Sequence, residues 1–463
     1  VAAATNLTPA SVVDSEAGRA FRQALGGAVL IPGDAGYEAA RRVWNGMIDK
    51  RPALIVRPRG AADVQRAVAF ARERDLPLSI KGGGHNVAGL ALVDGGLTLD
   101  LSGMRGVWVD PAARLARVQG GALWSDFDRE TAAFGLATTG GVISSTGVGG
   151  LTLGGGVGWL VGKHALSVDN LRSADLVTAD GEQIRASATE HPDLFWAVRG
   201  GGGNFGVVTS FEFRLHPQGD VLAGAIAYPM DQARDVLEFY RAFTATCPEA
   251  LTVYCTLFRD RDSRRRIVAF VLCWPGDLDE GVRVLAPLRA FGTPLFDKVG
   301  RMPYAVWQGA LDVKWPHGRR YYWKGNLLRD LPDDLLDAAV AFGAEPPIPW
   351  GQILIEFYAG AMNRVGVAET AYAQREARYQ FVMVGASDDP ADDAASVAWV
   401  RELHARTERH ALNGAFLNFN AVDGGDRIDR VRAAYGPNWE RLVAIKRRYD
   451  PTNFFRVNNN VVP

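Results

Sequence analysis

A histidine directly after three glycines is the feature of this chain that points most clearly to chemistry. The stretch reads Lys81-Gly-Gly-Gly-His-Asn-Val-Ala-Gly89 and follows an apolar run typical of a strand. Glycines leave several backbone N–H groups free to face an anion such as a pyrophosphate. His85 would then lie beside whatever this loop binds. The competing interpretation is a tight turn with His85 exposed, and these residues alone do not decide between the two.

A second glycine cluster matches a dinucleotide-binding pattern in the wrong context. Gly201-Gly-Gly-Asn-Phe-Gly206 satisfies G-x-G-x-x-G, which binds a pyrophosphate when a strand precedes it and a helix follows it. Residues 207–213 alternate instead like a strand. We therefore reject a Rossmann fold. The chain also has no Walker loop, no G-x-S-x-G nucleophile elbow and no H-E-x-x-H helix, and we expect no metal site.

Composition argues against several classes of protein. The 51 basic and 52 acidic residues give a formal net charge of −1, so no strong field would attract nucleic acid or an anionic membrane. No apolar stretch is long enough to span a bilayer. Three scattered cysteines, Cys247, Cys255 and Cys273, favour free thiols over a zinc site, with one disulfide as the alternative. No signal-peptide pattern is visible, so we expect a cytoplasmic location, with secretion left open.

The elements that must position these residues change in character near residue 215. Before it, glycine clusters interrupt short apolar runs. Hydrophobic spacing in this part predicts a helix at 63–74, a strand at 76–80, hairpins at 106–120 and 174–184, a helix at 191–199 and a strand at 207–213.

After His216 the sequence predicts longer strands and helices. Strands are expected at 223–228, 251–258, 266–274, 352–358 and 379–384, and helices at 232–246, 279–291, 391–410 and 426–449. This pattern is typical of an antiparallel sheet covered by helices. The predicted fold class is α+β with two domains. Residues 1–215 and a return at 415–463 form a ligand-binding domain, into which residues 216–414 are inserted.

Several motifs in a fixed order make the chain resemble the berberine bridge enzyme-like group of the vanillyl-alcohol oxidase/p-cresol methylhydroxylase superfamily. The matching segments are 81–89, 147–158, 166–170, 200–206 and 449–458. An ordered set is much more specific than any single motif. The resemblance extends from about residue 52 to the C-terminus. It implies a vanillyl-alcohol oxidase-type fold with a PCMH-type FAD-binding domain and a substrate domain.

The resemblance implies FAD bonded covalently through its 8α-methyl carbon to His85. The other cofactor-binding positions that it implies are Lys81, Gly82, Gly83, Gly84, Asn86, Gly89, Ser145, Thr146, Gly147, Gly149, Gly150, Gly154, Val208 and Asn458. Many members carry a second link from a cysteine four residues before the glycine that matches Gly147, where this chain has Ile143. We therefore expect attachment through His85 only, and a lower flavin potential than in doubly linked relatives.

The catalytic residues are less clear than the cofactor-binding ones. Members often use the tyrosine of a Tyr-x-Asn segment as the base, but this chain reads Phe416-Leu-Asn418. The candidates that remain are Glu356 and Tyr358, which would share one face of a strand, and Tyr321 and Tyr322, which follow Arg319-Arg320. Core packing is the competing interpretation for the tyrosines, and a solvated strand face for Glu356. Thr146 matches a position beside flavin C4a, where a small side chain permits access of oxygen.

The reaction that the resemblance implies is hydride transfer from a substrate C–H to flavin N5, aided by deprotonation of a neighbouring O–H. Molecular oxygen would then reoxidise the flavin and give hydrogen peroxide. The expected substrate is a small organic alcohol, a phenol or another secondary metabolite. The alternatives are an oligosaccharide oxidase, a dehydrogenase with a non-oxygen acceptor, a flavin-containing lyase or cyclase without net redox turnover, and a binding protein that has lost catalysis.

Overall fold

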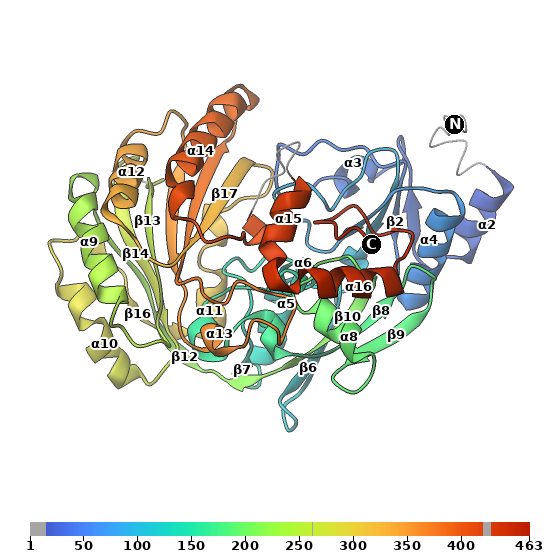
Figure 1. Cartoon of the computed structure of the whole chain (residues 1–463), viewed down its shortest axis with the longest axis horizontal. Helices are drawn as coiled ribbons and strands as arrows, with labels where there is room; N and C mark the ends of the chain where they lie inside the picture. The colour runs from blue at the N-terminus through green and yellow to red at the C-terminus, as the bar shows by residue number, and fades with distance from the viewer. Residues whose placement is uncertain (1–14, 262, 420–426) are drawn as a thin grey trace.

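The computed structural model describes residues 15–261, 263–419 and 427–463. It has two lobes, each built from sheets and helices (Figure 1). The first lobe carries the N-terminal part of the chain and the two last helices, and the second carries one large sheet with its covering helices. The predicted α+β class is confirmed.

Two sheets form the framework of the first lobe. In one sheet the order is β1 (Ala28–Leu30), β2 (Leu54–Arg57), β4 (Leu97–Asp100) and β3 (Leu78–Lys81), with β2–β4 and β3–β4 parallel. In the other the order is β5 (Val107–Asp110), β6 (Leu115–Gln119), β10 (Val207–Arg214), β8 (Leu171–Val177) and β9 (Gln183–Ser187). The second glycine cluster therefore leads into a strand, β10, as predicted, and not into the helix of a Rossmann fold.

One antiparallel sheet dominates the second lobe. Its order is β15 (Phe296–Asp297), β12 (Asp220–Pro229), β14 (Arg266–Trp274), β13 (Thr252–Arg259), β18 (Gln352–Phe357), β19 (Tyr379–Ser387) and β17 (Arg320–Leu328), and β16 (Gly300–Pro303) also pairs with β12. The prediction of an antiparallel sheet is confirmed. Strand β17 was not predicted, because Lys324, Gly325 and Asn326 interrupt its apolar run, although the strand is largely buried on both faces.

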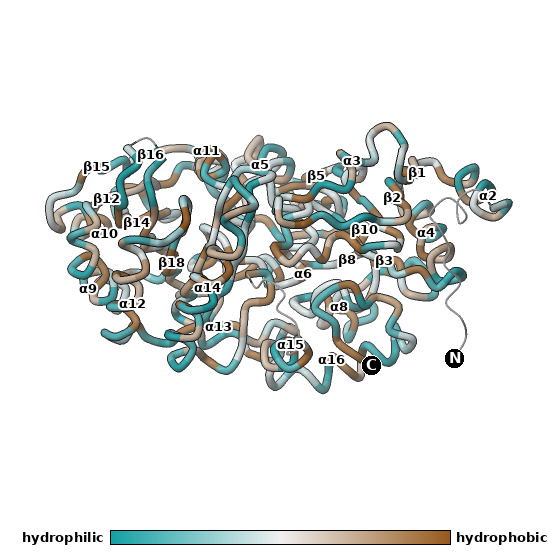
Figure 2. The backbone as a smooth tube through the Cα atoms, turned by 90° about the horizontal axis from the view of Figure 1, so that it is seen from above, coloured by the Kyte–Doolittle hydropathy of each residue, from teal (hydrophilic) through white to brown (hydrophobic). Residues whose placement is uncertain are grey.

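Four long helices cover one face of this sheet. They are α9 (Ala233–Thr244), α10 (Leu278–Ala290), α12 (Asp333–Ala344) and α14 (Asp393–Thr407), which lie on the side away from the first lobe (Figure 1). Every second strand residue packs against them, for example Val253, Cys255 and Leu257 of β13. The intervening residues point the other way, as the two-residue period of a strand requires. The tube coloured by hydropathy shows apolar segments running through both lobes (Figure 2).

The chain returns to the first lobe at its C-terminal end. Helices α15 (Arg427–Tyr435) and α16 (Trp439–Tyr449) share one hydrophobic cluster with α6 (Val148–Leu153) and α8 (Pro192–Val198), and α16 contacts α8 directly (Figure 1). The helical structure predicted at 426–449 is observed over residues 427–449, divided into two α-helices by a 3-10 turn at Gly436–Asn438, where Gly436 has a positive φ of 48° and Pro437 lacks a backbone N–H.

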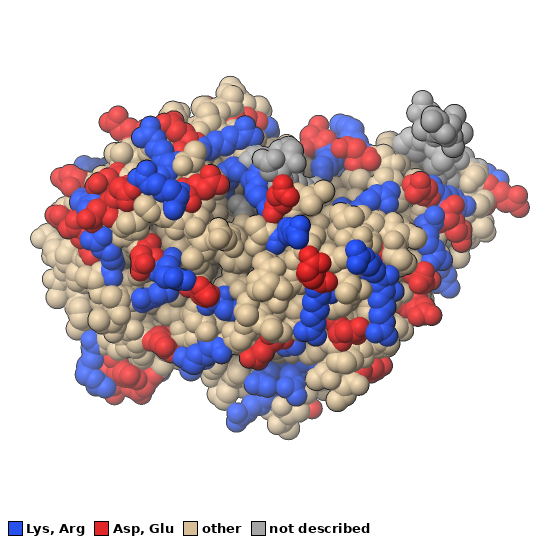
Figure 3. Space-filling model, in the orientation of Figure 1, with Lys and Arg blue, Asp and Glu red and all other residues tan. Residues whose placement is uncertain are grey.

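The surface carries charges of both signs. Acidic and basic groups are interspersed over the face in Figure 3, in keeping with the formal net charge of −1. Among the helices of the described residues, none combines the length and the hydropathy needed to cross a bilayer.

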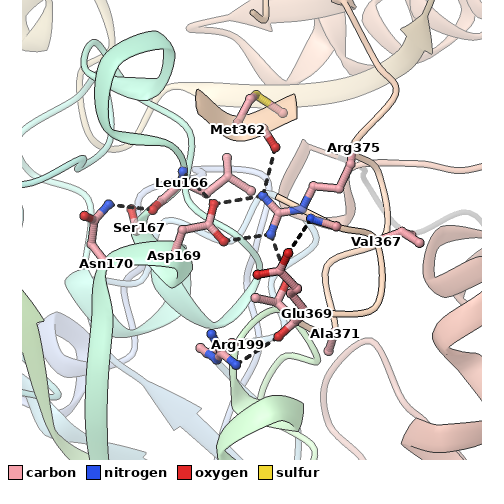
Figure 4. A network of polar contacts seen from close by, with 12 residues as sticks. Leu166, Ser167, Asp169, Asn170, Arg199, Met362, Val367, Glu369, Ala371 and Arg375 are labelled. Carbon is pink, nitrogen blue, oxygen red and sulfur yellow. Dashed lines mark hydrogen bonds and ion pairs between the residues drawn. The ribbon is translucent and has the colours of Figure 1, made fainter. Parts of the chain in front are cut away.

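A buried ion pair joins a loop of the second lobe to the first lobe (Figure 4). Arg375 donates to both carboxylate oxygens of Asp169 at 2.8 Å, and the two side chains are 4% and 7% exposed. The guanidinium also donates to Thr370 Oγ1 and to the carbonyl of Met362. A bidentate pair in this geometry fixes the loop against the first lobe.

Breaking this pair from one side should destabilise the protein more than removing both charges. We expect Arg375→Met to lower the free energy of unfolding by ~3–5 kcal/mol, because Asp169 would remain charged and buried. Adding Asp169→Asn should restore part of the loss. Thermal and urea unfolding measure both effects. Arg406→Met, which breaks the exposed pair with Glu402, is the control and should change stability by less than ~1 kcal/mol. A double variant less stable than Arg375→Met would contradict this account.

Candidate active site

A cavity of ≈ 320 Å³ lies between the two lobes. Its wall combines backbone segments of the first lobe with side chains from β13, β17, β18 and β19 of the second. The wall is mainly apolar. Among the described residues that line it, Glu356 is the only one with a carboxylate, and none is lysine or arginine.

Glycine backbone forms one part of this wall. Gly83 and Gly147 approach so closely that a Cβ on Gly83 would lie 2.4 Å from the backbone nitrogen of Gly147. Gly84 adopts a φ of +69°, which favours glycine. Within the described structure, the backbone N–H groups of Gly83, Gly84 and His85 donate to no protein acceptor. This segment can therefore offer several backbone donors to an anionic ligand.

The C-terminal residues 455–459 complete the glycine-rich part of the wall. Their path is fixed by Lys446 and Asp450, whose side chains are fully buried and 2.6 Å apart. Lys446 Nζ also donates to two backbone carbonyls at 2.8 and 3.0 Å. The Asp450 carboxylate accepts the N–H groups of Phe454 and Phe455 at 2.7 and 2.8 Å. The buried pair thus holds the tail across the cavity.

His85 lies on the wall with its ring enclosed. Trp44 stacks on it at 5.1 Å between centroids, and His317 approaches edge-on at 5.3 Å. Ser145 Oγ is 3.0 Å from Nε2, and Thr146 Oγ1 is 3.4 Å from Nδ1. Burial, with a smaller effect of His317, lowers the pKa of His85 to about 3. The imidazole is therefore neutral at neutral pH and keeps a nitrogen lone pair that can act as a nucleophile.

Glu356 is the acidic group of the cavity. It lies on β18 and pairs with Tyr254 of β13 and Gln380 of β19. Burial raises the pKa of Glu356 to about 7, and a hydrogen bond from Tyr358 partly offsets this. The side chain is 2% exposed, so its protonation depends on neighbours and bound molecules more than on bulk water.

The hydroxyl group of Tyr358 connects Glu356 to Gln380 by hydrogen bonds. The Tyr358 hydroxyl donates to Glu356 Oε2 at 2.6 Å and also makes a hydrogen bond with Gln380 Oε1. A tyrosine has a single hydroxyl hydrogen, so it cannot donate to both acceptors at once. When Glu356 is protonated, the carboxyl can donate to Tyr358, which then donates to Gln380. The arrangement can therefore accommodate both protonation states of Glu356.

Aromatic rings from both lobes form part of the cavity wall. Trp44 stacks on Tyr321 at 3.9 Å between centroids, and Trp323 stacks on Phe419 at 5.8 Å. Phe416 also lines the cavity, so the position where many members carry a tyrosine is apolar here. These rings suit a planar or apolar substrate.

Most of the predicted cofactor positions meet at this cavity. Those that line it are Gly82, Gly83, Gly84, His85, Asn86, Thr146, Gly147, Gly149, Gly150, Gly154, Val208 and Asn458. Ser145 does not line the cavity but contacts His85. Lys81 lies away from the wall, because its Nζ donates to the carbonyls of Ala40 and Arg42. Gly89 forms a turn with a φ of +69°, packed against Ile48.

The predicted catalytic residues separate into three positions. Glu356 and Thr146 line the cavity, and Tyr358 lies behind Glu356. Tyr322 does not belong to the site. It points to the helix-covered face of the sheet, where Arg401 Nε donates to its hydroxyl at 3.1 Å. A side chain on the opposite face of β17 cannot reach the substrate.

Several cavity residues escaped the sequence analysis. They are Trp44, Tyr254, Trp315, Trp323 and Phe419. The alternation along the predicted strand 251–258 was a usable signal for Tyr254. The others lie in segments for which no element was predicted.

Comparisons with known proteins show the family to which this chain belongs. A model of the FAD binding domain matches residues 52–187, and a model named berberine and berberine like matches residues 415–462. The (R)-6-hydroxynicotine oxidase of Paenarthrobacter nicotinovorans is 33% identical over 454 residues, which are 94% of this chain and 97% of the relative. This chain belongs to the berberine bridge enzyme-like FAD-linked oxidoreductases.

Two further similarities extend over nearly the whole of this chain. An FAD-linked oxidoreductase of Dictyostelium discoideum is 30% identical over 446 residues, 96% of each protein. The crystal structure of 6-hydroxy-D-nicotine oxidase from Arthrobacter nicotinovorans matches with a TM-score of 0.85 and 31% identity, over 95% of this chain and 98% of that one.

The cavity fits the FAD of this family. Backbone N–H groups without protein acceptors suit a diphosphate, and a Cβ at Gly83 or Gly147 would collide with the backbone that forms this cradle. The apolar remainder of the wall suits a flavin ring.

Proposed function

We propose that this oxidoreductase is an oxidase that binds FAD covalently through His85 alone and removes a hydride from a C–H of a small alcohol, phenol or related metabolite. Molecular oxygen would be the final acceptor, with hydrogen peroxide as the product. The observation that carries the proposal is that the described residues of one cavity wall combine the glycine cradle, a neutral histidine and a single carboxyl group. FAD, when bound, supplies the electron-accepting chemistry.

The first lobe would bind and fix the cofactor. Gly83, Gly84 and His85 offer backbone N–H groups to the diphosphate. The neutral imidazole of His85 is the nucleophile for attachment, with its ring held by Trp44 and its nitrogens by hydroxyl groups. Ile143 lines the cavity where many relatives have a cysteine, which supports a single attachment.

The second lobe would bind the substrate and take its proton. Glu356 is the acceptor that we assign, because it is the carboxylate of the described wall and its pKa of about 7 suits proton transfer at neutral pH. Tyr358 and Gln380 hold the carboxyl group in place. The aromatic wall excludes water and orients the substrate ring.

The charge and shape of the wall favour a small aromatic substrate without a negative charge. A carboxylate or phosphate on the substrate would find no lysine or arginine among the described lining residues. The relative named as an oxidase of 6-hydroxynicotine supports a small ring compound over an oligosaccharide.

Anaerobic flavin bleaching tests the proposed function. The holoenzyme is mixed with aromatic alcohols, phenolic metabolites and oligosaccharides, and air is then admitted. Bleaching by an aromatic compound with rapid recovery in air is expected. Slow recovery would make the enzyme a dehydrogenase, and conversion of a substrate without bleaching or oxygen uptake would indicate a non-redox lyase or cyclase.

The buried pair beneath the tail should control retention of the cofactor. In a His85→Ala background, where FAD can dissociate, we expect Lys446→Met to weaken FAD binding by about tenfold or more. The reason is that residues 455–459 would lose their anchor and Asp450 would be left buried without its cation. Fluorescence titration with FAD measures the effect. Lys163→Met, which removes a lysine that donates to Pro275 away from the cavity, is the control. Equal affinities in both variants would contradict the assigned role.

A further inference from the structure

The hydroxyl group of Tyr254 is buried at the cavity without a partner. Tyr254 is 3% exposed and lines the cavity, and its hydroxyl has no hydrogen bond within the described structure. Its ring stacks on Trp159 at 5.0 Å between centroids, which fixes the direction of the hydroxyl. Burying a hydroxyl group without a hydrogen bond costs ~1–3 kcal/mol, so a bound molecule that accepts from Tyr254 would remove this cost.

The register of the sheet places Tyr254 beside the proposed proton acceptor. Tyr254 of β13 is directly opposite Glu356 of β18. Such cross-strand neighbours have Cβ atoms about 4.5–5.5 Å apart on one face of the sheet. Glu356 receives its hydrogen bond from Tyr358, so Tyr254 stays available to a third group. Burial, and then the proximity of Glu356, raises the pKa of Tyr254 well above its usual value, so the hydroxyl remains a donor.

We propose that Tyr254 is a substrate-binding residue whose hydroxyl donates to the substrate heteroatom that faces Glu356. This inference rests on the proposed function, which assigns a proton acceptor to the substrate but no hydrogen-bond donor. The substrate heteroatom donates a hydrogen bond to Glu356, and a lone pair of the same heteroatom accepts one from the Tyr254 hydroxyl. The substrate group must therefore be both donor and acceptor, as a hydroxyl or an amine is. A carboxylate has no proton for Glu356 and meets no cation in the described wall.

A second buried tyrosine provides a matched control. The hydroxyl of Tyr304 is also buried without a hydrogen-bond partner in the described structure, but Tyr304 does not line the cavity. It belongs to the same apolar cluster as Tyr254 and Trp159. Replacing either tyrosine by phenylalanine removes one oxygen atom and keeps the ring. A general effect of altering this cluster would appear in both variants, whereas a contact with the substrate would appear only in Tyr254→Phe.

The test compares small aromatic probes on the anaerobic holoenzyme. Phenol, toluene and benzoate are titrated while the perturbation of the flavin absorption spectrum is followed. The wild type should bind phenol more tightly than toluene or benzoate. Tyr254→Phe should weaken phenol binding by about 3–10-fold and leave toluene unchanged, as expected for one neutral hydrogen bond. Tyr304→Phe should change neither.

Three results would overturn the role of Tyr254. They are equal binding of phenol and toluene by the wild type, unchanged phenol binding in Tyr254→Phe, and benzoate binding as tight as that of phenol. Covalent flavin content is measured on the same samples after acid precipitation. A wild type without covalent flavin would instead contradict the proposed attachment, so failure of the two proposals can be told apart.

Discussion

Replacing Glu356 by glutamine should slow anaerobic flavin reduction by about 10²–10⁴-fold, the usual contribution of a general base. The substitution keeps the shape of the side chain and its contact with Tyr358, but the amide cannot accept a proton. Flavin content should stay at the wild-type level, because Glu356 lies on the sheet of the second lobe and not in the glycine cradle. Stopped-flow absorbance with a substrate that bleaches the wild type gives the rate. A variant within a few-fold of the wild type would exclude Glu356 as the base.

The same residue should set the pH dependence of flavin reduction. Glu356 accepts a proton only when it is ionised, so the rate should rise with pH through about 7, where its pKa lies, and level off above. In Glu356→Gln the residual rate should not change across this range. Asp128 offers a matched control, because burial also raises its pKa to about 7, yet it does not line the cavity. Asp128→Asn should keep the wild-type profile, and loss of the pH dependence in that variant would move the assignment away from Glu356.

Replacing His85 by alanine should abolish covalent attachment of the flavin completely. The reason is that His85 supplies the nucleophilic nitrogen in the proposed attachment, and that Ile143, which also lines the cavity, cannot provide a second link. After precipitation in acid, the wild-type pellet should be yellow, whereas the variant should give a colourless pellet and a yellow supernatant. The glycine cradle remains in the variant, so FAD should still bind reversibly before precipitation.

His164 provides the control for this experiment. Burial lowers its pKa to about 3, as it does for His85, but its ring stacks on His216 and does not line the cavity. His164→Ala should therefore keep a yellow pellet. A yellow pellet in His85→Ala would show that another residue carries the flavin, and colourless pellets in both variants would point to a folding defect.

The strands could be predicted where a run rich in apolar residues marks them. The strand after Gly206 and strands β13, β14 and β18 are such runs and appear close to the predicted positions, although most of their residues are buried on both faces. Strand β17 is also largely buried on both faces, with Tyr321 toward the first lobe and Tyr322 under the helices. Its run is interrupted by Lys324, Gly325 and Asn326, so it does not show the apolar pattern of a buried strand.

Residues of the candidate site that belong to one short motif could be predicted, whereas those brought together by strand pairing could not. The cradle around Gly83 and His85 is a local motif and could be recognised from the sequence. The choice between Tyr321, Tyr322 and Trp323 depends on strand register, since a shift of one residue exchanges the two faces. The partnership of Tyr254 with Glu356 depends on pairing between strands far apart in the chain. Neither can be obtained from spacing alone.

The position of residues 455–459 in the cavity wall has a consequence for biosynthesis. Trp44 and the glycine cradle leave the ribosome well before residues 455–459, because the whole second lobe is translated between them. A nascent chain that lacks residues 455–459 has the cradle but not this part of the cavity wall. FAD would therefore be enclosed only after the second lobe and residues 455–459 have been synthesised.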